Sequence, residues 1–233
     1  MAERPIFIPD PESSKLVKEV CLNFTWHPGL APSQKKKNII SLHDAAAKNN
    51  IQPLLEVSTK SPDVLGQHLS AFNLHIDTHR YGRLPLETAF QGSKVFERGG
   101  PFTDLYGKEP RDARGDLRLK ESGALTGFKF ENIWFPLQPK TVFYDWLYLS
   151  ALFKHRDWLE RHILRFAGFT DIEFNPERSI NCQARSCALL VSLLSQHQLD
   201  AVGESPSAFL EFILRQDYKP ERRQTAFQAS SAK

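Results

Sequence analysis

Three side chains of the segment Leu86–Lys94 could carry out chemistry together. Glu87, Gln91 and Lys94 follow one another at intervals of four and three residues. On a helix this spacing covers nearly two full turns, so Glu87 and Lys94 would lie almost one above the other, with Gln91 between them. A carboxylate and an amine at one end of a pocket are suited to opening and hydrolysing a glycosidic carbon.

The residues around this group favour a buried helix. We expect the helix to start at Pro85, which suits a first helical turn, to carry apolar side chains as far as Phe96, and to stop before Gly99 and Gly100. Burial favours the neutral form of a lysine amine, which can then attack a carbonyl-like carbon while a nearby carboxylate moves the protons. The paired glycines allow a ligand to approach the backbone closely. The competing interpretation is a solvated helix stripe with a weak ion pair.

Two further groups of residues could bind a ligand. Trp134 belongs to an expected hairpin beside a polar segment, so it could stack on a flat ring, although core packing is the common role of such side chains. Asp171 and Glu173 could accept hydrogen bonds from ribose hydroxyls, or they could belong to a simple connector that turns at Asn175-Pro176. The polar helix start near Ser179 could meet a phosphate or be an ordinary N-cap.

The bulk composition describes a globular chain without marked charge. It has 233 residues, of which 41% are apolar, and a formal net charge of +3. This balance permits a nucleic-acid partner but does not indicate one. Three cysteines without metal-ligand spacing indicate reduced thiols. There is neither a leader-like N-terminus nor an apolar run of the roughly 18 residues that a membrane span needs, so we expect a soluble, cytoplasmic protein without a membrane partner.

Motif searches argue against several enzyme classes. The patterns G-x-G-x-x-G, G-x-S-x-G, H-E-x-x-H and the P-loop are absent, which disfavours dinucleotide oxidoreductases, kinases, serine hydrolases and zinc proteases. His75 and His79 are four residues apart but fall on an expected strand and turn without acidic or cysteine neighbours. We therefore expect no metal and no other cofactor. The lysines at 35–37 are interpreted as a solvated helix start that could also contact phosphates.

Hydrophobic periodicity and turn residues predict an α+β fold, in a single helix-rich domain with a small β-sheet. The domain is expected to span residues 1–215, with N-terminal strands at about 5–26 as an extension and residues 216–233 as a disordered tail. Residues 101–124 are polar and are expected to form a long loop. The other strands are expected at 54–57, 74–77, 128–130 and 133–135. The other helices are expected at 35–47, 140–154, 156–166 and 180–197, and from the N-cap Ser205 to Leu214.

At these residues the sequence resembles the NADAR family of ADP-ribose-related N-glycosidases. The shared pattern is a Ser-x-Phe strand end and then a helix that begins with Glu and carries Gln and Lys, here Ser70-Ala71-Phe72 and Glu87 to Phe96. The segments around Asp171 and Asn181 are similar to the C-terminal Asp and Asn elements of the family, although Phe174 stands where Trp is common. The resemblance covers residues 54 to 200 and is greatest for the branch found beside DarT-type toxins, which attach ADP-ribose to bases in DNA.

The resemblance implies an antitoxin that removes ADP-ribose from guanine in DNA, without a metal or a cofactor. Lys94 would be the nucleophile that forms a Schiff base with the ring-opened ribose, and Glu87 would be the acid and base. The implied substrate-binding residues are Ser70, Phe72, Asn73, Gln91, Arg98, Gly99, Gly100, Trp134, Asp171 and Asn181.

Within this resemblance Trp134 would hold the base, Asp171 and Asn181 the ribose, and Arg98 with the neighbouring glycines the pyrophosphate. The functional partner would be a DarT-type toxin, and we expect a monomer or a weak oligomer. Two other functions stay open. One is an N-glycosidase of a small nucleotide, such as a riboflavin-pathway intermediate. The other is a non-catalytic protein that binds an ADP-ribosylated site or a toxin, which would not need both the amine and the carboxylate.

Overall fold

The largest sheet in the computed structural model, which describes residues 1–203 and 205–220, has the strand order β2-β1-β9-β3. The first two strands form a long antiparallel pair, and β9 runs antiparallel to β1 and parallel to β3. The N-terminal pair predicted as an extension is therefore continuous with the main sheet. The strands are β1 (Ala2–Asp10), β2 (Leu16–Phe24), β3 (Leu54–Glu56) and β9 (Gly168–Thr170).

Two smaller antiparallel sheets lie apart from the main sheet. One is the hairpin of β4 (His75–Thr78) and β5 (Gly82–Pro85). In the other, the central strand β7 (Leu125–Phe130) pairs with β6 (Lys94–Phe96) on one side and β8 (Ile133–Phe135) on the other. The hairpin predicted at 128–135 is confirmed, and so is the strand predicted at 74–77, which pairs with the unpredicted strand β5.

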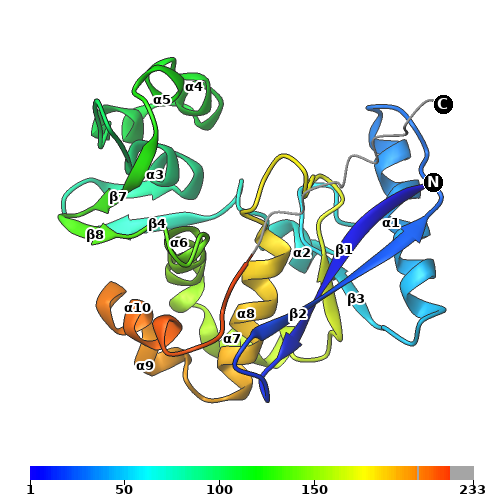
Figure 1. The fold of residues 1–233 in the computed structure, drawn as a ribbon. Helices are drawn as coiled ribbons and strands as arrows, with labels where there is room; N and C mark the ends of the chain where they lie inside the picture. Colours follow the sequence, from blue (N-terminus) through cyan, green and yellow to red (C-terminus); the bar gives the residue numbers. More distant parts are fainter. Residues whose placement is uncertain (204, 221–233) are drawn as a thin grey trace, which may run out of the picture.

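The helices surround these sheets unevenly. α1 lies with the main sheet at one end of the molecule, α3 and the short helices after it lie at the other end, and α6 and α8 pass between them (Figure 1). The predicted α+β class, with one helix-rich domain and small sheets, is confirmed. The helices outside residues 101–124 are α1 (Pro32–Ala47), α2 (Val64–His68), α3 (Leu86–Gly92), α6 (Val142–Phe153), α7 (Arg156–Ile163), α8 (Gln183–Ser195), α9 (Leu199–Gly203) and α10 (Pro206–Leu214).

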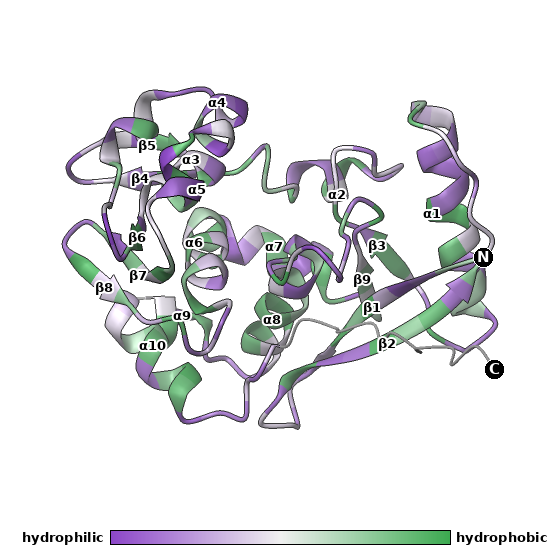
Figure 2. Ribbon diagram, turned by 45° about the horizontal axis from the view of Figure 1, so that its top comes forward, coloured by the Kyte–Doolittle hydropathy of each residue, from purple (hydrophilic) through white to green (hydrophobic). Residues whose placement is uncertain are grey.

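Helix α8 organises the core. Every residue from Gln183 to Leu194 is buried, and the hydrophobic run of this helix stands out in Figure 2. Its side chains join a large cluster that also includes the phenylalanines of β7 and β8 and the buried face of α6. A smaller cluster, with Ile39 and Leu42 of α1 against Ile6 and Phe24, covers the other side of the main sheet. Elements from both ends of the molecule are thus fixed against one central helix.

Helix α3 ends earlier than predicted. A Cβ at its last residue, Gly92, would lie 2.5 Å from the ring of Tyr106, so only glycine allows this close approach. The chain then enters β6, where Lys94 pairs with Phe128 of β7. The prediction that Glu87 and Lys94 share one helix is wrong, because strand pairing outweighs the local helical spacing.

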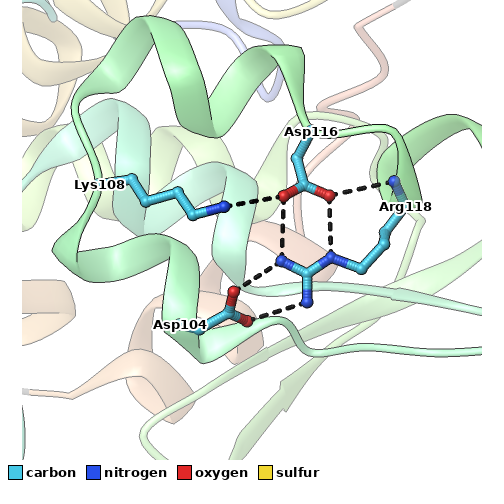
Figure 3. Close-up of polar contacts among 4 residues, drawn as sticks. All are labelled: Asp104, Lys108, Asp116 and Arg118. Atoms are coloured by element: carbon cyan, nitrogen blue, oxygen red, sulfur yellow. Dashed lines mark hydrogen bonds and ion pairs between the residues drawn. The ribbon is translucent and has the colours of Figure 1, made fainter.

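The segment 101–124 is not the long loop that its composition predicts. Only Leu105, Tyr106 and Ala113 of the helical part are buried. The sequence of this segment therefore has too few apolar positions to show a helical period. Ion pairs centred on Arg118 hold the segment together instead (Figure 3). Its three short helices are η1 (Thr103–Gly107), α4 (Pro110–Gly115) and α5 (Arg118–Glu121).

Two predictions in the C-terminal half need correction. The helix expected at 156–166 ends at Ile163, and the chain then forms the unpredicted strand β9. Gly168 opens that strand at a place where a Cβ would lie 3.1 Å from Leu54. The helix expected from residue 180 begins at Gln183, and α9 has no counterpart in the prediction. A strand of three residues is defined by its pairing with strands that are distant in the sequence. Local hydrophobic periodicity does not reveal such pairing.

The beginning of the expected disordered tail, 216–233, is anchored in the core by Tyr218. This side chain is 1% exposed, and its hydroxyl donates to Oδ2 of Asp145 at 2.9 Å. The Nε of Arg185 donates to the same hydroxyl at 3.3 Å. The chain after Asp217 is polar in composition, but its first residue, Tyr218, is a buried aromatic side chain. Residues 221–233 of the expected tail lie outside the described part of the chain.

We expect Tyr218→Ala to lower the free energy of unfolding by about 3–5 kcal/mol, the usual cost of truncating a buried aromatic side chain. Tyr218→Phe keeps the ring and should cost about 1–3 kcal/mol, because Asp145 loses one donor. Urea unfolding followed by circular dichroism measures both. If Tyr218→Ala were as stable as the wild type, the anchoring role would be refuted.

Candidate active site

A cavity of about 630 Å³ opens between α3 and the loop that precedes α8. Helix α3 and the first residue of β6 form one wall, and the loop at 171–181 forms another. Strand β7 and helix α6 contribute aromatic side chains between these walls. The cavity therefore joins parts of the chain that only the tertiary fold brings together.

Glu87, Gln91 and Lys94 meet in this cavity as a hydrogen-bonded series. The Nζ of Lys94 donates to Oε1 of Gln91 at 2.6 Å, and Nε2 of Gln91 donates to Oε1 of Glu87 at 2.8 Å. The Nε of Arg114 donates to the same oxygen of Glu87 at 3.1 Å. The amine and the carboxylate thus belong to one network, although they lie on different elements.

The Lys94 amine lies in a largely desolvated position. Its Nζ is 5.0 Å from the centroid of the Phe90 ring. Burial lowers the pKa of Lys94 to about 8, while the charge of Glu87 opposes this shift and that of Arg114 adds to it. An appreciable fraction of the amine is therefore neutral in mildly alkaline solution, and a neutral amine is a nucleophile.

The aromatic surface of the cavity does not include Trp134. Residues next to each other along a strand point to opposite faces of the sheet. Lys94 pairs with Phe128, which lines the cavity, whereas the Trp134 ring covers the preceding Gly127 on the other face. Trp134 thus faces away from Lys94 and is half-exposed. The aromatic residues that line the cavity are Phe72, Phe90, Phe128 and Tyr144.

The loop before α8 presents carboxylate and amide oxygens to the cavity. Asp171 accepts hydrogen bonds from Nε2 of Gln183 at 2.9 Å and from the N–H of Glu173 at 3.0 Å. The Oδ1 of Asn181 is buried and has no hydrogen-bond partner among the described residues. A buried acceptor without a donor is costly, so a donor from a ligand, such as a ribose hydroxyl, would be favoured there.

A second buried carboxyl group, that of Glu56, lies behind this loop. It is 1% exposed and accepts hydrogen bonds from Oγ of Ser58, Oγ1 of Thr170 and the N–H of Ile172, at 2.7, 2.7 and 2.9 Å. Burial raises the pKa of Glu56, and the neighbouring charge of Asp171 raises it further. Burial also raises the pKa of Asp171. Two adjacent carboxyl groups do not ionise independently, so the pair of buried Glu56 and partly exposed Asp171 holds a proton more readily than two isolated acids in water would.

A second cavity, of about 440 Å³, adjoins the first. It extends along the loop before α8 toward Ser58 and Arg178. Because several side chains line both spaces, the two form one elongated cleft, which we call the cleft from here on. The shared residues are Phe72, Arg114, Asp171, Ser179, Asn181 and Gln183.

Part of the predicted site is brought together in the cleft. Ser70 lies behind it, fully buried, with its Oγ 3.4 Å from Oε1 of Gln183. The backbone N–H of Ala71 donates to the same oxygen at 2.7 Å. Ser70 thus lies behind the lining residue Gln183, whereas Ala71 lines the cleft itself. The predicted residues that line the cleft are Phe72, Glu87, Gln91, Lys94, Asp171 and Asn181.

The remaining predicted residues do not line the cleft, and their expected substrate contacts do not fit this geometry. Asn73 donates to a backbone carbonyl of α2, and Arg98 donates to the carbonyl of Glu121 at 2.7 Å. A Cβ at Gly100, whose φ is +90°, would lie 2.2 Å from the carbonyl oxygen of Lys94, so this glycine serves chain packing behind β6. The residues concerned are Asn73, Arg98, Gly99, Gly100 and Trp134.

Sequence reasoning does not single out Arg114 or Glu56 as parts of the site. Arg114 lies in the segment 101–124, where frequent charges indicate solvent exposure. Glu56 offers a usable signal, because a carboxylate inside an expected buried strand must be paired, hydrogen-bonded or protonated. Gln183 belongs to a helix start whose many polar residues do indicate a ligand or a buried network.

Other site types are rare in the part of the chain that the structure describes. Within residues 1–203 and 205–220, no group of three or more His, Cys, Asp and Glu side chains is placed to hold a metal ion. No helix in the same ranges has both the length and the apolar character needed to cross a membrane. Cys182 and Cys187 are buried free thiols.

The structure is a small α+β domain in which Glu87 of a helix and Lys94 of the following strand meet in one cleft, and these are the two residues that carry the resemblance to the NADAR family. The sequence model of the DarT1-associated NADAR antitoxins matches residues 2–223. The chain belongs to this family, which confirms the resemblance seen in the motifs and extends it to the N-terminal strands. No curated protein shows a significant match to the sequence.

The pH dependence of stability tests the environment of Glu56. A carboxyl group whose pKa is raised on folding stabilises the protein fully at low pH, and this contribution is lost as pH rises through the folded pKa. The free energy of unfolding should therefore decline from about pH 5 to about pH 8 in the wild type and decline less in Glu56→Gln, which does not titrate. Denaturant unfolding across this range gives the comparison, with the exposed Glu12→Gln as the matched control. Parallel curves for wild type and Glu56→Gln would contradict the raised pKa.

Proposed function

We propose that the protein is a DNA-guanine ADP-ribosyl hydrolase that reverses the modification made by a DarT-type toxin. The observation that carries the proposal is the desolvated Lys94 amine, joined through Gln91 to Glu87. Membership of the DarT1-associated antitoxin family supports the partner and the antitoxin role. The proposed substrate is DNA that carries ADP-ribose on a guanine base.

In the proposed reaction, the first step opens the ribose ring. Glu87, with its proton supplied from solvent, gives that proton to the ring oxygen, whose bond to C1′ then breaks. The electron pair of the base nitrogen forms a C=N bond to C1′. The neutral Nζ of Lys94 adds to this carbon, and the base leaves with the electron pair of its own C–N bond and takes up a proton.

The second step releases the sugar. An imine now joins C1′ to Nζ of Lys94, and water adds to it with Glu87 accepting a proton. The C1′–Nζ bond breaks, the amine recovers its proton, and the aldehyde closes again to the ribose ring. The net change is the addition of one water across the glycosidic bond, without any change of oxidation state.

The size and lining of the cleft support a large substrate. Its two adjoining cavities, of about 630 and 440 Å³, offer room beyond the ribose that would sit at Lys94. Aromatic side chains line the cavity that holds the amine, and carboxylate and amide oxygens lie on the wall shared with the second cavity. This distribution favours a ligand with a flat base, a ribose and a further polar part.

Lys94→Ala should fold normally and lose the release of ADP-ribose, because the imine cannot form. Borohydride should convert the wild-type imine into a stable amine, so that mass spectrometry finds a ribosyl adduct on Lys94. Lys94→Arg is the matched control, since it keeps a positive charge without forming an imine. Full turnover by Lys94→Ala would rule out the proposed nucleophile. Offering a free ADP-ribosylated nucleotide beside modified DNA shows which substrate is preferred.

Turnover should also depend on pH through the Lys94 amine. The first step needs Lys94 neutral and Glu87 protonated, a state that carries as many protons as the ammonium with the carboxylate. Because the pKa of Lys94 is lowered to about 8, the single-turnover rate should be level below this pH and fall close to tenfold per unit above it. Rapid-quench measurements between about pH 6 and about pH 9 at saturating substrate follow this change. A rate that rises throughout this range would mean that the first step does not need a protonated Glu87.

A further inference from the structure

The helical segment at residues 103–121, which contains η1, α4 and α5, places one arginine at the cleft. Arg114 of α4 donates from Nε to Glu87, and its guanidinium carbon is 5.5 Å from the centroid of the Phe72 ring. Its side chain is 56% exposed and lines both cavities. The terminal amino groups of Arg114 make no hydrogen bond to any of the described residues. The donors of this guanidinium are therefore only partly used by the protein.

A compact ion-pair network holds the helical segment 103–121 in shape (Figure 3). Arg118 bonds Asp104 through both terminal amino groups, at 3.2 and 2.6 Å, and Asp116 through Nε at 2.9 Å. Lys108 adds a contact to Asp116 at 3.1 Å. Asp104 in η1 before α4 and Asp116 directly after it are thus both bonded to Arg118, which ties together the chain on either side of α4. Such bidentate pairs add geometric specificity, so Arg114 is positioned before a ligand arrives.

A second arginine lines the second cavity, the one that extends along the loop before α8. Arg178 lies in the loop before α8, is exposed, and has no side-chain hydrogen bond or ion pair with the described residues. The carboxylates that line this cavity do not pair with Arg178. Glu173 pairs with Lys35 at 3.1 Å instead. Asp171 is bonded to Gln183, and burial favours its neutral form.

We propose that Arg114 and Arg178 bind the diphosphate of the ADP-ribosyl group in the second cavity. The inference rests on the proposed function and assigns the binding of its anionic part. Arg114 would keep Nε on Glu87 and turn its two terminal amino groups to phosphate oxygens, a planar fork that matches phosphate geometry. Arg178 would contact the diphosphate from the facing loop. A substrate bound this way has its ribose beside Lys94 and Glu87.

Calorimetric titration with ADP tests the assignment without any turnover. Arg114→Gln and Arg178→Gln should each weaken ADP binding by about tenfold to a hundredfold, the usual effect of losing a charge-assisted hydrogen bond. Arg114→Lys should recover part of the affinity, because the charge stays while the fork is lost. Arg215→Gln is the matched control, since Arg215 pairs with Glu211 on the surface at the end of α10. Thermal unfolding of each variant verifies that it is folded.

Two results would overturn the inference. Unchanged ADP affinity in both folded variants, or no ADP binding by the wild type, would remove the diphosphate site. Weakened binding of an unmodified DNA strand, with ADP affinity unaffected, would assign the two arginines to backbone phosphates of DNA instead. Because ADP binding needs no chemistry, an inactive wild type that binds ADP through both arginines would refute the proposed hydrolysis and leave the phosphate site standing.

Discussion

The side-chain amide of Gln91 is the interaction on which the site depends. Its oxygen accepts from Lys94 and its nitrogen donates to Glu87, so one planar group sets the orientation of both the amine and the carboxylate. Gln91 itself is 7% exposed and is held in α3 by the core. The early end of that helix then matters chemically, because it moves Lys94 onto a strand whose pairing with β7 fixes the amine against Phe90.

The other wall of the cleft depends on a buried polar network behind it. Glu56 ties β3 to the residues on either side of Asp171, which carries the polar surface of the loop. Gln183 links Asp171 to the backbone of Ala71. Each of these buried groups is satisfied by another, and a network of this kind is specific as well as stable only when it is complete. The geometry of the cleft is therefore set from the core outward.

Sequence reasoning reached the residues whose chemistry is local and missed those placed by tertiary contacts. Glu87, Gln91 and Lys94 were found from their types and spacing, although the shared helix assumed for them is wrong. Asp171 was proposed because a carboxylate can accept hydrogen bonds from ribose hydroxyls, and both it and Asn181 lie in segments that resemble a known pattern. The structure places Trp134 outside the cleft, because pairing register decides which face of the sheet a side chain takes. It also places Gly100 outside the cleft, where close packing of the chain behind β6 requires a glycine. Arg114 lay hidden in a charged segment that folds through ion pairs.

The most direct test of the central claim follows the release of ADP-ribose from a DNA oligonucleotide modified on guanine, by mass spectrometry and in the presence of a chelator. The account predicts stoichiometric conversion to free ADP-ribose and unmodified oligonucleotide by the wild-type protein, with one oxygen from water in the sugar product. Tight binding of the modified oligonucleotide without release would contradict it and would leave a protein that shields the modified base instead of restoring it.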